Sequence, residues 1–410
     1  MTTNDRGSSI FGASLNFSNS IVGAGVVGVG GAVANSGGIV SLVSLLGFAV
    51  LTKLSFDIVI DLALETNATT SSYEDLGRVA FGTSGYLAVA ISKGLFAFGC
   101  LVAYVVICKL SFAPACRSLF LEDPNSPPGE GITSIFFDET WSTLFLSATV
   151  MLPLSLMRDM TLLEKFSAAK IVIFLLIVLI LIYLAMTMSG DEIESAENPH
   201  TFQDHWFAVN PGFLQSMGTF VFAFIGQHMC HLVYHSLRLE DRNLNGWKKV
   251  STLSVALAAL LSSLMGFTVY VTFWEAADSN IFGLYPPSPA VDTARILLCI
   301  EIVLTYPPAF FSCRDLIIGF LPHGTRQHAD GQVTEKDVLL GQHADSRWWL
   351  IPGDERQLIR PFHAVLTIVL WATTVCLALA APSLGEVLNL VGCATGTGKY
   401  CTRLDVLKNT

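Results

Sequence analysis

The sequence predicts an all-α polytopic membrane protein built from two inverted repeats of five spans, in which spans one and six are broken. Hydrophobic residues make up 52% and charged residues 14% of the 410, and the mean hydropathy is +0.57. Soluble domains carry about one quarter charged residues. Apolar segments of membrane-spanning length recur along the chain, and two of them are interrupted by glycine and polar residues.

A hydrocarbon core about 30 Å thick requires about 20 apolar residues per helix. Segments of this kind lie near 10–34, 38–62, 84–110, 140–157, 166–188, 213–236, 248–273, 291–320 and 361–381. A tenth begins at Ser383 and ends within about a dozen residues. We expect about nine to ten spans in one membrane domain, residues 1–396. This domain has one long polar loop, 323–360, and an aberrant polar tail, 397–410, follows the domain.

The loops of this domain carry their charges asymmetrically. Loops 121–139, 190–210 and 275–292 hold thirteen acidic residues and neither Lys nor Arg, whereas the alternate loops hold the cations. Since Lys and Arg mark the cytoplasmic side, we expect a cytoplasmic N-terminus. The net charge of −10 reflects the acidic loops. No basic stripe predicts a nucleic-acid partner.

The first span is interrupted by Asn19-Ser20-Ile21-Val22-Gly23-Ala24-Gly25. A break in a membrane helix is tolerated only where it faces protein or a water-filled cavity. Amides at the start of the second half-helix suit a carboxylate, and carbonyls at the end of the first suit an ammonium or Na⁺. Close packing of small residues is the alternative.

Residues 23–28 also match G-x-G-x-x-G, the dinucleotide fingerprint. That motif requires a preceding strand and an acidic residue about 20 positions later. Here apolar sequence lies on both sides, and the first downstream acid is Asp57. The dinucleotide interpretation therefore fails.

The sixth span is interrupted at Gly226-Gln227-His228. Broken helices at corresponding positions of two halves indicate a transporter whose substrate lies between them. The pair of breaks therefore predicts a secondary transporter.

Three segments resemble the amino acid/auxin permease family, and most closely its sodium-coupled neutral amino acid transporters and vacuolar relatives. They are residues 16–37 with the Gly23–Gly25 break, Phe222-Ala223-Phe224 in span six, and Leu304-Thr305-Tyr306-Pro307 with Arg314 in span eight. The likeness extends over residues 9–396. It implies an eleven-span LeuT-type fold and an amino acid transporter domain over residues 1–396.

The resemblance also implies roles for individual residues. The substrate-binding residues would be Ile21, Val22, Gly23, Ala24, Gly25, Gly226, Gln227 and His228. Asn19 and Thr305 match family positions associated with a sodium site. Gln227 stands where the family usually has His, and His228 where it often has Pro. Val303 replaces a Thr, which removes one oxygen ligand for Na⁺. The chain also stops before an eleventh span, which indicates a truncated C-terminus.

Glu301 lies one helical turn before Thr305. A carboxylate in the middle of a span costs about 2.5 kcal/mol or more on insertion scales, so it must face a cavity or a partner. Proton coupling through Glu301 and a structural pair with a base such as Lys53 are the two interpretations. Together with Val303, Glu301 favours H⁺ over Na⁺ as the coupling ion. In span two, Lys53, Asp57 and Asp61 form one helical stripe, for which structural pairing is the first interpretation.

His228, His231 and His235 would share one face of span six, which suggests a metal site and, as an alternative, a membrane metallohydrolase. No second span offers a further ligand motif, so we expect neither a metal nor a cofactor beyond the coupling ion, H⁺ or Na⁺. The predicted function is secondary active transport of amino acids, most of all neutral L-amino acids, rather than catalysis. A transporter-like amino acid sensor is the other alternative. The partners are the amino acid and the bilayer of a plasma, vacuolar or lysosomal membrane.

The predicted membrane orientation can be tested at Asn67-Ala68-Thr69. It is a glycosylation sequon, yet the charge asymmetry assigns it to the cytoplasmic side. We expect Asn67 to carry no glycan. A glycosidase-sensitive mass shift that disappears in Asn67→Gln would reverse the predicted orientation.

Overall fold

The structure, a computed structural model, describes residues 7–66, 72–120, 137–157, 167–188, 206–207, 209–319 and 360–395. Within these ranges the regular structure is helical, apart from one isolated bridge between Ser8 and Leu237. Asn67, the tail 397–410 and the expected loop up to residue 359 lie outside the described residues.

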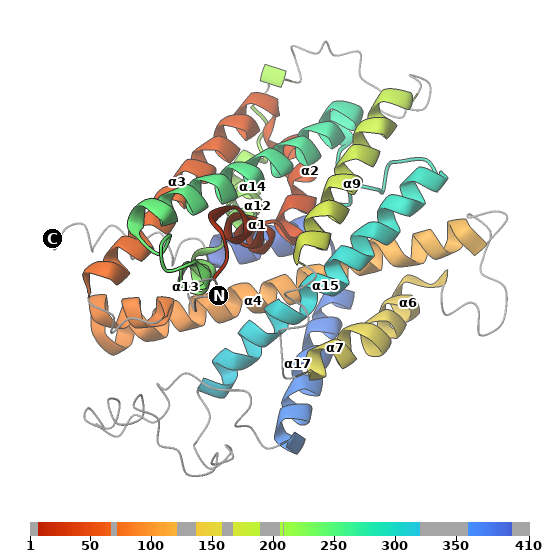
Figure 1. The fold of residues 1–410 in the computed structure, drawn as a ribbon. Coiled ribbons are helices and arrows are strands. Elements are labelled where there is room, and N and C mark those ends of the chain that lie inside the picture. The colour runs from red at the N-terminus through yellow and green to blue at the C-terminus, as the bar shows by residue number, and fades with distance from the viewer. Residues whose placement is uncertain are drawn as a thin grey trace, which may run out of the picture.

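The helices of the first five expected spans are coloured from red to yellow-green in Figure 1. They are α1 (Ile10–Ile21), α2 (Ala24–Ser36), α3 (Gly38–Glu65), α4 (Tyr73–Phe120), α6 (Glu139–Leu146), the π-helical turn η2 (Ser147–Met151), α7 (Leu152–Leu156) and α9 (Ser167–Thr187).

The second half continues the same pattern. Its helices are α12 (Phe213–Phe222), the 3₁₀ turn η3 (Gln227–Met229), α13 (Cys230–Ser236), α14 (Leu244–Phe273), the 3₁₀ turn η4 (Trp274–Ala276), α15 (Pro289–Gly319), α17 (Arg360–Ala380) and a last apolar helix, Leu384–Thr395.

Six helices of the described residues are long and apolar enough to cross a membrane, and the bent pair α1–α2 makes a seventh candidate. Expected spans four and six are divided into shorter pieces, by η2 and by the break after α12, so length alone does not identify them. The tenth is the short helix Leu384–Thr395. The predicted all-α membrane architecture is confirmed.

Local sequence signals explain where several helices begin. The Ser9 hydroxyl caps α1 by accepting the Gly12 amide at 3.2 Å, and the Asn243 side chain caps α14 by accepting the Gly246 amide at 2.9 Å. Gly37 joins α2 to α3 with φ 92°, a conformation that L side chains rarely adopt. The Ser9 cap and Gly37 mark the two ends of the broken first span.

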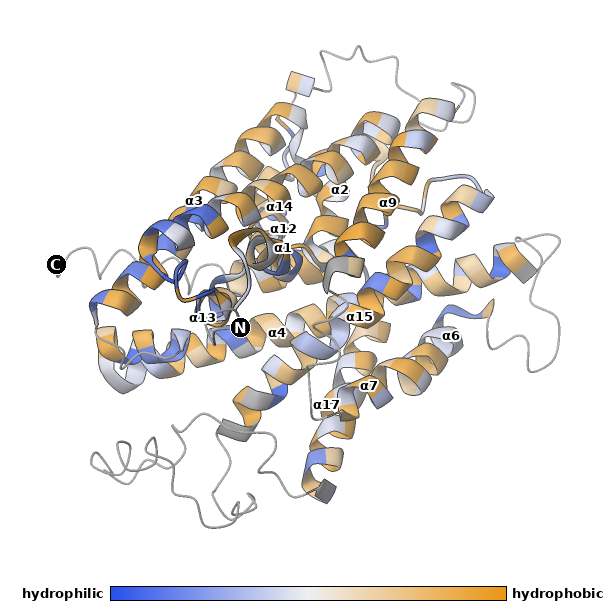
Figure 2. Ribbon diagram, in the orientation of Figure 1, coloured by the Kyte–Doolittle hydropathy of each residue, from blue (hydrophilic) through white to orange (hydrophobic). Residues whose placement is uncertain are grey.

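The helices differ in how deeply they are buried. In α4, 72% of the most apolar window is buried, against 33% in each of α3, α9 and α17. α4 packs along α15, and the two cross near the middle of the molecule (Figure 1). Most of the helix length is hydrophobic (Figure 2), which suits lipid contact on the outer helices. The interior is therefore organised around α2, α4, α14 and α15.

A buried arginine ties three helices together. Arg314 of α15 is fully buried and donates to the Ser155 carbonyl of α7 at 2.6 Å and to the Thr367 hydroxyl of α17 at 2.7 Å. The Thr367 hydroxyl in turn donates to the His363 carbonyl at 2.8 Å. Because a buried guanidinium must have its donors satisfied, this cluster fixes α7, α15 and α17 against one another.

Thr367→Val tests that cluster. Valine keeps the shape but removes the acceptor for Arg314, so we expect a loss of about 1.5 kcal/mol in stability. The measurement is the melting temperature of the purified protein in detergent. Thr373→Val is the matched control, because the exposed Thr373 hydroxyl bonds only the Val369 carbonyl of its own helix. Equal melting temperatures for the two variants would contradict the role of Arg314.

Candidate functional site

The first span breaks where the sequence predicts. α1 ends at Ile21 and α2 begins at Ala24, with a bend of 58° between their axes. Val22 and Gly23 are extended, with φ/ψ of −73°/109° and −157°/−145°. Among the described residues no acceptor serves the amides of Gly23, Ala24 and Gly25, which lie at the start of the 13-residue α2. Three backbone donors are therefore free at the positive end of a helix.

The sixth span breaks at the same level. α12 ends at Phe222, residues 223–226 leave the helix, and Gly226 has φ −150°. The Gln227 side chain is buried, and its carbonyl oxygen accepts the Gly226 amide at 3.2 Å. The predicted interruption at Gly226-Gln227-His228 is thus present, although it begins three residues earlier, at Ala223.

The two breaks are in direct contact. A Cβ at Gly25 would lie 2.7 Å from the Ala223 Cα, and one at Gly226 would lie 3.0 Å from Cγ1 of Ile21. Only glycine permits backbones to approach this closely. Seven of the eight predicted substrate residues, Ile21–Gly25 with Gly226 and Gln227, therefore gather in one place. The eighth, His228, stacks on Phe96 of α4 with ring centroids 5.6 Å apart.

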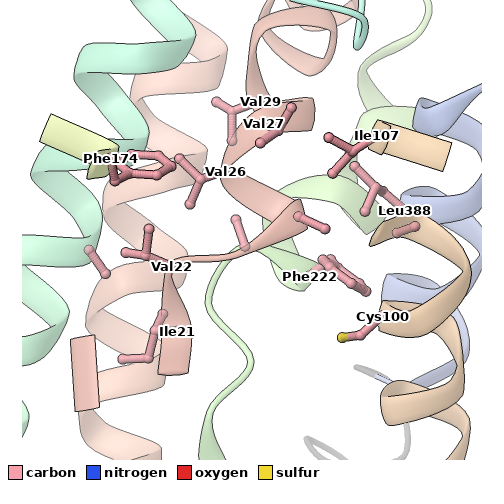
Figure 3. Close-up of a cluster of buried hydrophobic side chains, with 14 of the residues drawn as sticks. Ile21, Val22, Val26, Val27, Val29, Cys100, Ile107, Phe174, Phe222 and Leu388 are labelled. Atoms are coloured by element: carbon pink, nitrogen blue, oxygen red, sulfur yellow. The ribbon is translucent and has the colours of Figure 1, made fainter. Parts of the chain in front are cut away.

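Apolar side chains surround the breaks. In Figure 3, Ile21, Val22, Val26 and Phe174 lie on one side of the bend, and Phe222, Cys100, Ile107 and Leu388 on the other. Phe222 stacks on Phe96 at 5.2 Å between centroids. These side chains offer hydrophobic contact to a ligand side chain.

The predicted ion-coupling residues lie in a buried polar cluster. The Thr305 hydroxyl lies 2.9 Å from the Glu301 Oε1 and 2.9 Å from the Glu301 carbonyl oxygen. Lys170 Nζ of α9 lies 3.5 Å from Thr305 Oγ1. Glu301 is 2% exposed, Thr305 8% and Lys170 7%. Asn19 is also buried, near the end of α1.

Lys170 and Tyr104 are residues that the sequence interpretation missed. Lys170 is the only charged residue in the apolar helix α9, and that isolation was the available signal. Tyr104 of α4 carries its hydroxyl to within 3.0 Å of the Cβ position of Gly23. No local pattern marks Tyr104, because its role depends on the packing of α4 against the break.

Glu301 does not pair with Lys53, contrary to that alternative. Lys53 pairs with Asp57 of its own helix at 2.6 Å, and Asp57 also accepts from the Ser251 hydroxyl at 2.6 Å. The structural pairing expected within the Lys53–Asp57–Asp61 stripe is confirmed for Lys53 and Asp57. Lys53 therefore has its counter-ion within its own helix, α3. The base that reaches the Glu301–Thr305 pair is Lys170 of α9, through its contact with Thr305.

The histidine metal site is not formed. The part of the chain that the structure describes holds no group of three or more His, Cys, Asp or Glu side chains able to bind a metal ion. His228 lies in η3, whereas His231 and His235 lie in α13, so the break removes the common helical face. His231 is buried and His235 is exposed.

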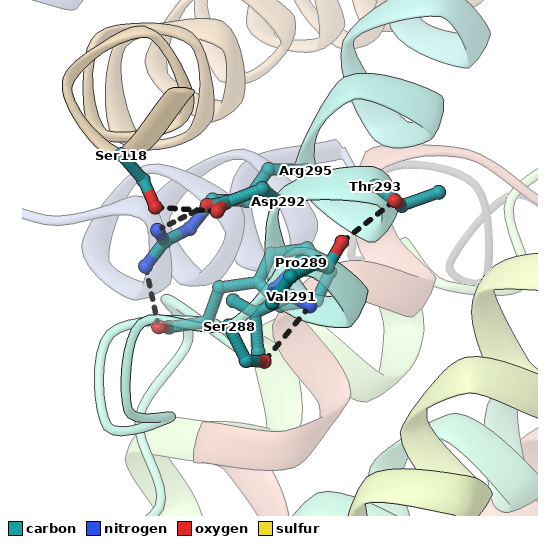
Figure 4. A network of polar contacts seen from close by, with 8 residues as sticks. Ser118, Ser288, Pro289, Val291, Asp292, Thr293 and Arg295 are labelled. Atoms are coloured by element: carbon teal, nitrogen blue, oxygen red, sulfur yellow. Dashed lines mark hydrogen bonds and ion pairs between the residues drawn. The ribbon is translucent and has the colours of Figure 1, made fainter. Parts of the chain in front are cut away.

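A second polar cluster joins α15 to α4 and to the segment at Phe282. Arg295 of α15 donates to the Phe282 carbonyl at 3.0 Å and pairs with Asp292 at 3.4 Å, and Ser118 of α4 donates to Asp292 (Figure 4). The segment that Arg295 holds packs on α2: a Cβ at Gly30 would contact Val269 and lie 3.7 Å from the Asp278 carbonyl. Residues 278 and 279 thus pack on the middle of α2, beyond the break.

The helices and their paired breaks form a fold of the LeuT type. A nucleobase-cation-symport-1 transporter, Mhp1, superposes with a TM-score of 0.58 at 11% identity, covering 96% of this chain and 77% of that one. A Na⁺-coupled sialic acid symporter superposes with a TM-score of 0.59 at 13% identity, covering 97% and 80%. The predicted LeuT-type fold is confirmed.

Residues 6–399 match the family described as "Transmembrane amino acid transporter protein", and the chain belongs to this family. A putative sodium-coupled neutral amino acid transporter 11 of Danio rerio is 27% identical over 94% of this chain and 75% of its own length. Vacuolar amino acid transporter 2 of Saccharomyces cerevisiae is 24% identical over 96% and 75%. The predicted family, the multi-pass membrane location and the absence of an enzymatic role are confirmed.

Gly25→Val tests the breaks as the functional site. The added side chain would meet the Ala223 Cα and Phe222, so it must push the two breaks apart. We expect amino acid uptake to fall below detection while membrane insertion is kept. Gly47→Val on α3 is the matched control, because nothing lies within 4 Å of its Cβ position. Unchanged apparent affinity in Gly25→Val would show that the site lies elsewhere.

Proposed function

We propose that the protein is a secondary active transporter that moves neutral L-amino acids together with H⁺. Membership of the transmembrane amino acid transporter family and the LeuT-type fold supply the class of activity. The touching breaks offer free amides to the α-carboxylate of an amino acid, in the way that helix N-termini bind anions.

Neutral substrates suit the side chains around the breaks. The side chains that Figure 3 labels beside the bend are hydrophobic. A charged substrate side chain placed there would lose its hydration without a partner, at a cost of several kcal/mol. The name of the Danio rerio relative, a putative sodium-coupled neutral amino acid transporter, agrees with this preference for neutral substrates.

The contact between Lys170 and Thr305 is the observation that favours H⁺ over Na⁺ as the coupling ion. The ammonium lies 3.5 Å from the hydroxyl that would otherwise be available to Na⁺. Two unit cations 4 Å apart repel by about 4 kcal/mol at an effective dielectric constant of 20. Val303, where a threonine would offer another oxygen, weakens a sodium site further. Lys170 and Glu301 can themselves take up and release a proton, so the cluster supports H⁺ coupling without a metal-ion ligand set.

The test is uptake into proteoliposomes with pH and Na⁺ gradients imposed separately. An inward gradient of one pH unit carries about 1.4 kcal/mol per proton, enough for about tenfold accumulation at one proton per substrate. We expect this accumulation in the wild type and none in Glu301→Gln or Lys170→Met, because each variant removes one of the two groups that take up and release the proton. Exchange of labelled for unlabelled amino acid should remain.

Lys248→Met is the control for loss of one positive charge, since Lys248 is exposed at the start of α14. Accumulation that follows the Na⁺ gradient, ignores the pH gradient and survives in Glu301→Gln would refute proton coupling. Specific binding without accumulation or exchange would instead identify an amino acid sensor.

A further inference from the structure

The last described helix, Leu384–Thr395, packs closely against the first half of span six. A Cβ at Gly392 would lie 2.6 Å from the Gly218 carbonyl carbon, and one at Gly218 would lie 2.7 Å from the Asn389 Cα. Small residues on both sides let two helix backbones approach this closely. Asn389 is thereby placed beside the backbone of α12, at the turn that precedes the break in span six.

The Asn389 side chain bonds to the backbone of this turn. Its oxygen Oδ1 accepts the Thr219 main-chain amide at 2.9 Å and the Thr219 hydroxyl at 2.7 Å, across 170 positions of sequence. Inside an α-helix a main-chain amide ordinarily donates to the carbonyl four residues earlier. A side chain that enters this ladder is one of the few causes of a sharp bend in a helix. α12 ends three residues after the contact, at Phe222.

Thr219 connects this contact to the point where the two breaks touch. The Thr219 carbonyl accepts the Ala223 amide at 3.0 Å, a bond that closes the last turn of α12. Ala223 is the residue whose Cα lies 2.7 Å from the Cβ position of Gly25. The Thr219 methyl group also lies 3.3 Å from the Cβ position of Gly28, so one side chain borders both broken spans. A shift of Thr219 therefore shifts the contact between the breaks.

The residue before Asn389 links the last helix to span one. Leu388 is buried, and its Cδ1 is the nearest atom to the Cβ position of Gly28. The last helix thus holds α2 by an apolar contact and α12 by a polar one. Apolar packing is non-directional, whereas hydrogen bonds require particular distances and angles. The bonds to Asn389 are therefore the contacts that fix the rotation and register of α12.

Given the proposed function, we propose that Asn389 is a positioning residue, which holds the break in span six against the break in span one in the arrangement that binds the substrate. Asn389 acts through Thr219 and does not itself contact the amino acid. Without its bonds, only a fraction of the molecules has the two breaks correctly placed, and the apparent Kd rises by the inverse of that fraction. Because the fraction is a property of the protein, the rise is the same for every substrate.

Asn389→Leu is the variant that tests this role, since leucine keeps a similar size and removes the acceptor. The probes are L-alanine, L-glutamine and L-leucine, and the readouts are equilibrium binding to the purified protein and uptake kinetics. We expect the Kd and KM of all three to rise by one common factor of about ten. The kcat should change by about threefold or less, because saturating substrate restores the competent arrangement.

Two further variants separate the loss of these bonds from a general disturbance of the helix. Asn389→Asp keeps an acceptor oxygen beside Thr219, so its Kd should stay within about threefold of wild type. Thr219→Val removes one of the two donors and should raise the Kd of all three amino acids by a smaller common factor, about threefold. Thr395→Val is the matched control, because the Thr395 hydroxyl bonds the Val391 carbonyl of its own helix; its Kd should equal that of wild type.

Hydrogen exchange of the amides of residues 219–225 gives a readout that needs no substrate. It should be faster in Asn389→Leu than in wild type and unchanged in Thr395→Val, because only the first variant releases the last turn of α12.

Wild-type Kd values in both Asn389→Leu and Thr219→Val would overturn the role of Asn389. A rise in Kd that differs among the three amino acids would also overturn it, because such a difference indicates contact with the substrate side chain. A wild type that binds none of the three would overturn the proposed function. Faster exchange in Asn389→Leu would then still identify Asn389 as the residue that positions the break, and unchanged exchange would overturn both.

Discussion

The contact between the two helix breaks is the constraint on which the rest of the structure depends. Backbone groups released inside a membrane need partners from protein or ligand, because the lipid has none to offer. Gly25 against Ala223 and Gly226 against Ile21 bring the two released segments together, so each break shields the other from lipid. The surrounding helices follow from this requirement: α14 packs against α1 and α2, Phe56 of α3 meets Gly226, and Phe174 of α9 lies beside the bend.

The sequence predicts most of this frame because its signals are local. Gly23 and Gly25, in an apolar run of spanning length, predict a helix break from the local sequence alone. The starts of α1 and α14 follow from the caps Ser9 and Asn243. Span four is harder, because the π turn at Ser147–Met151 divides it without an obvious signal. Span six breaks at Ala223, three residues before the polar residues that attract attention.

The buried cluster of Glu301, Thr305 and Lys170 was only partly predictable, since its members come from different spans. Glu301 and Thr305 are one turn apart on a single helix, so the sequence pairs them. Lys170 joins them from a position 135 residues away from Thr305, and no periodicity reveals that contact. The same limit explains the error over Lys53: its own helix provides Asp57 at i+4, a closer partner than any that burial of Glu301 suggests. Tyr104 meets Gly23 across 81 positions of sequence.

Spans three and eight connect the break in span one with the buried cluster at Glu301. They hold corresponding positions in the two repeats, and here they are α4 and α15, which lie against each other. α4 directs Tyr104 towards the break in span one, and α15 directs Glu301 towards Lys170 and Thr305. Because α4 and α15 lie against each other, a movement of α15 at the Glu301 cluster is transmitted to the α4 residues beside the break. Under the proposed function, proton and amino acid would influence each other through this packing, and by linkage that influence must be equal in both directions.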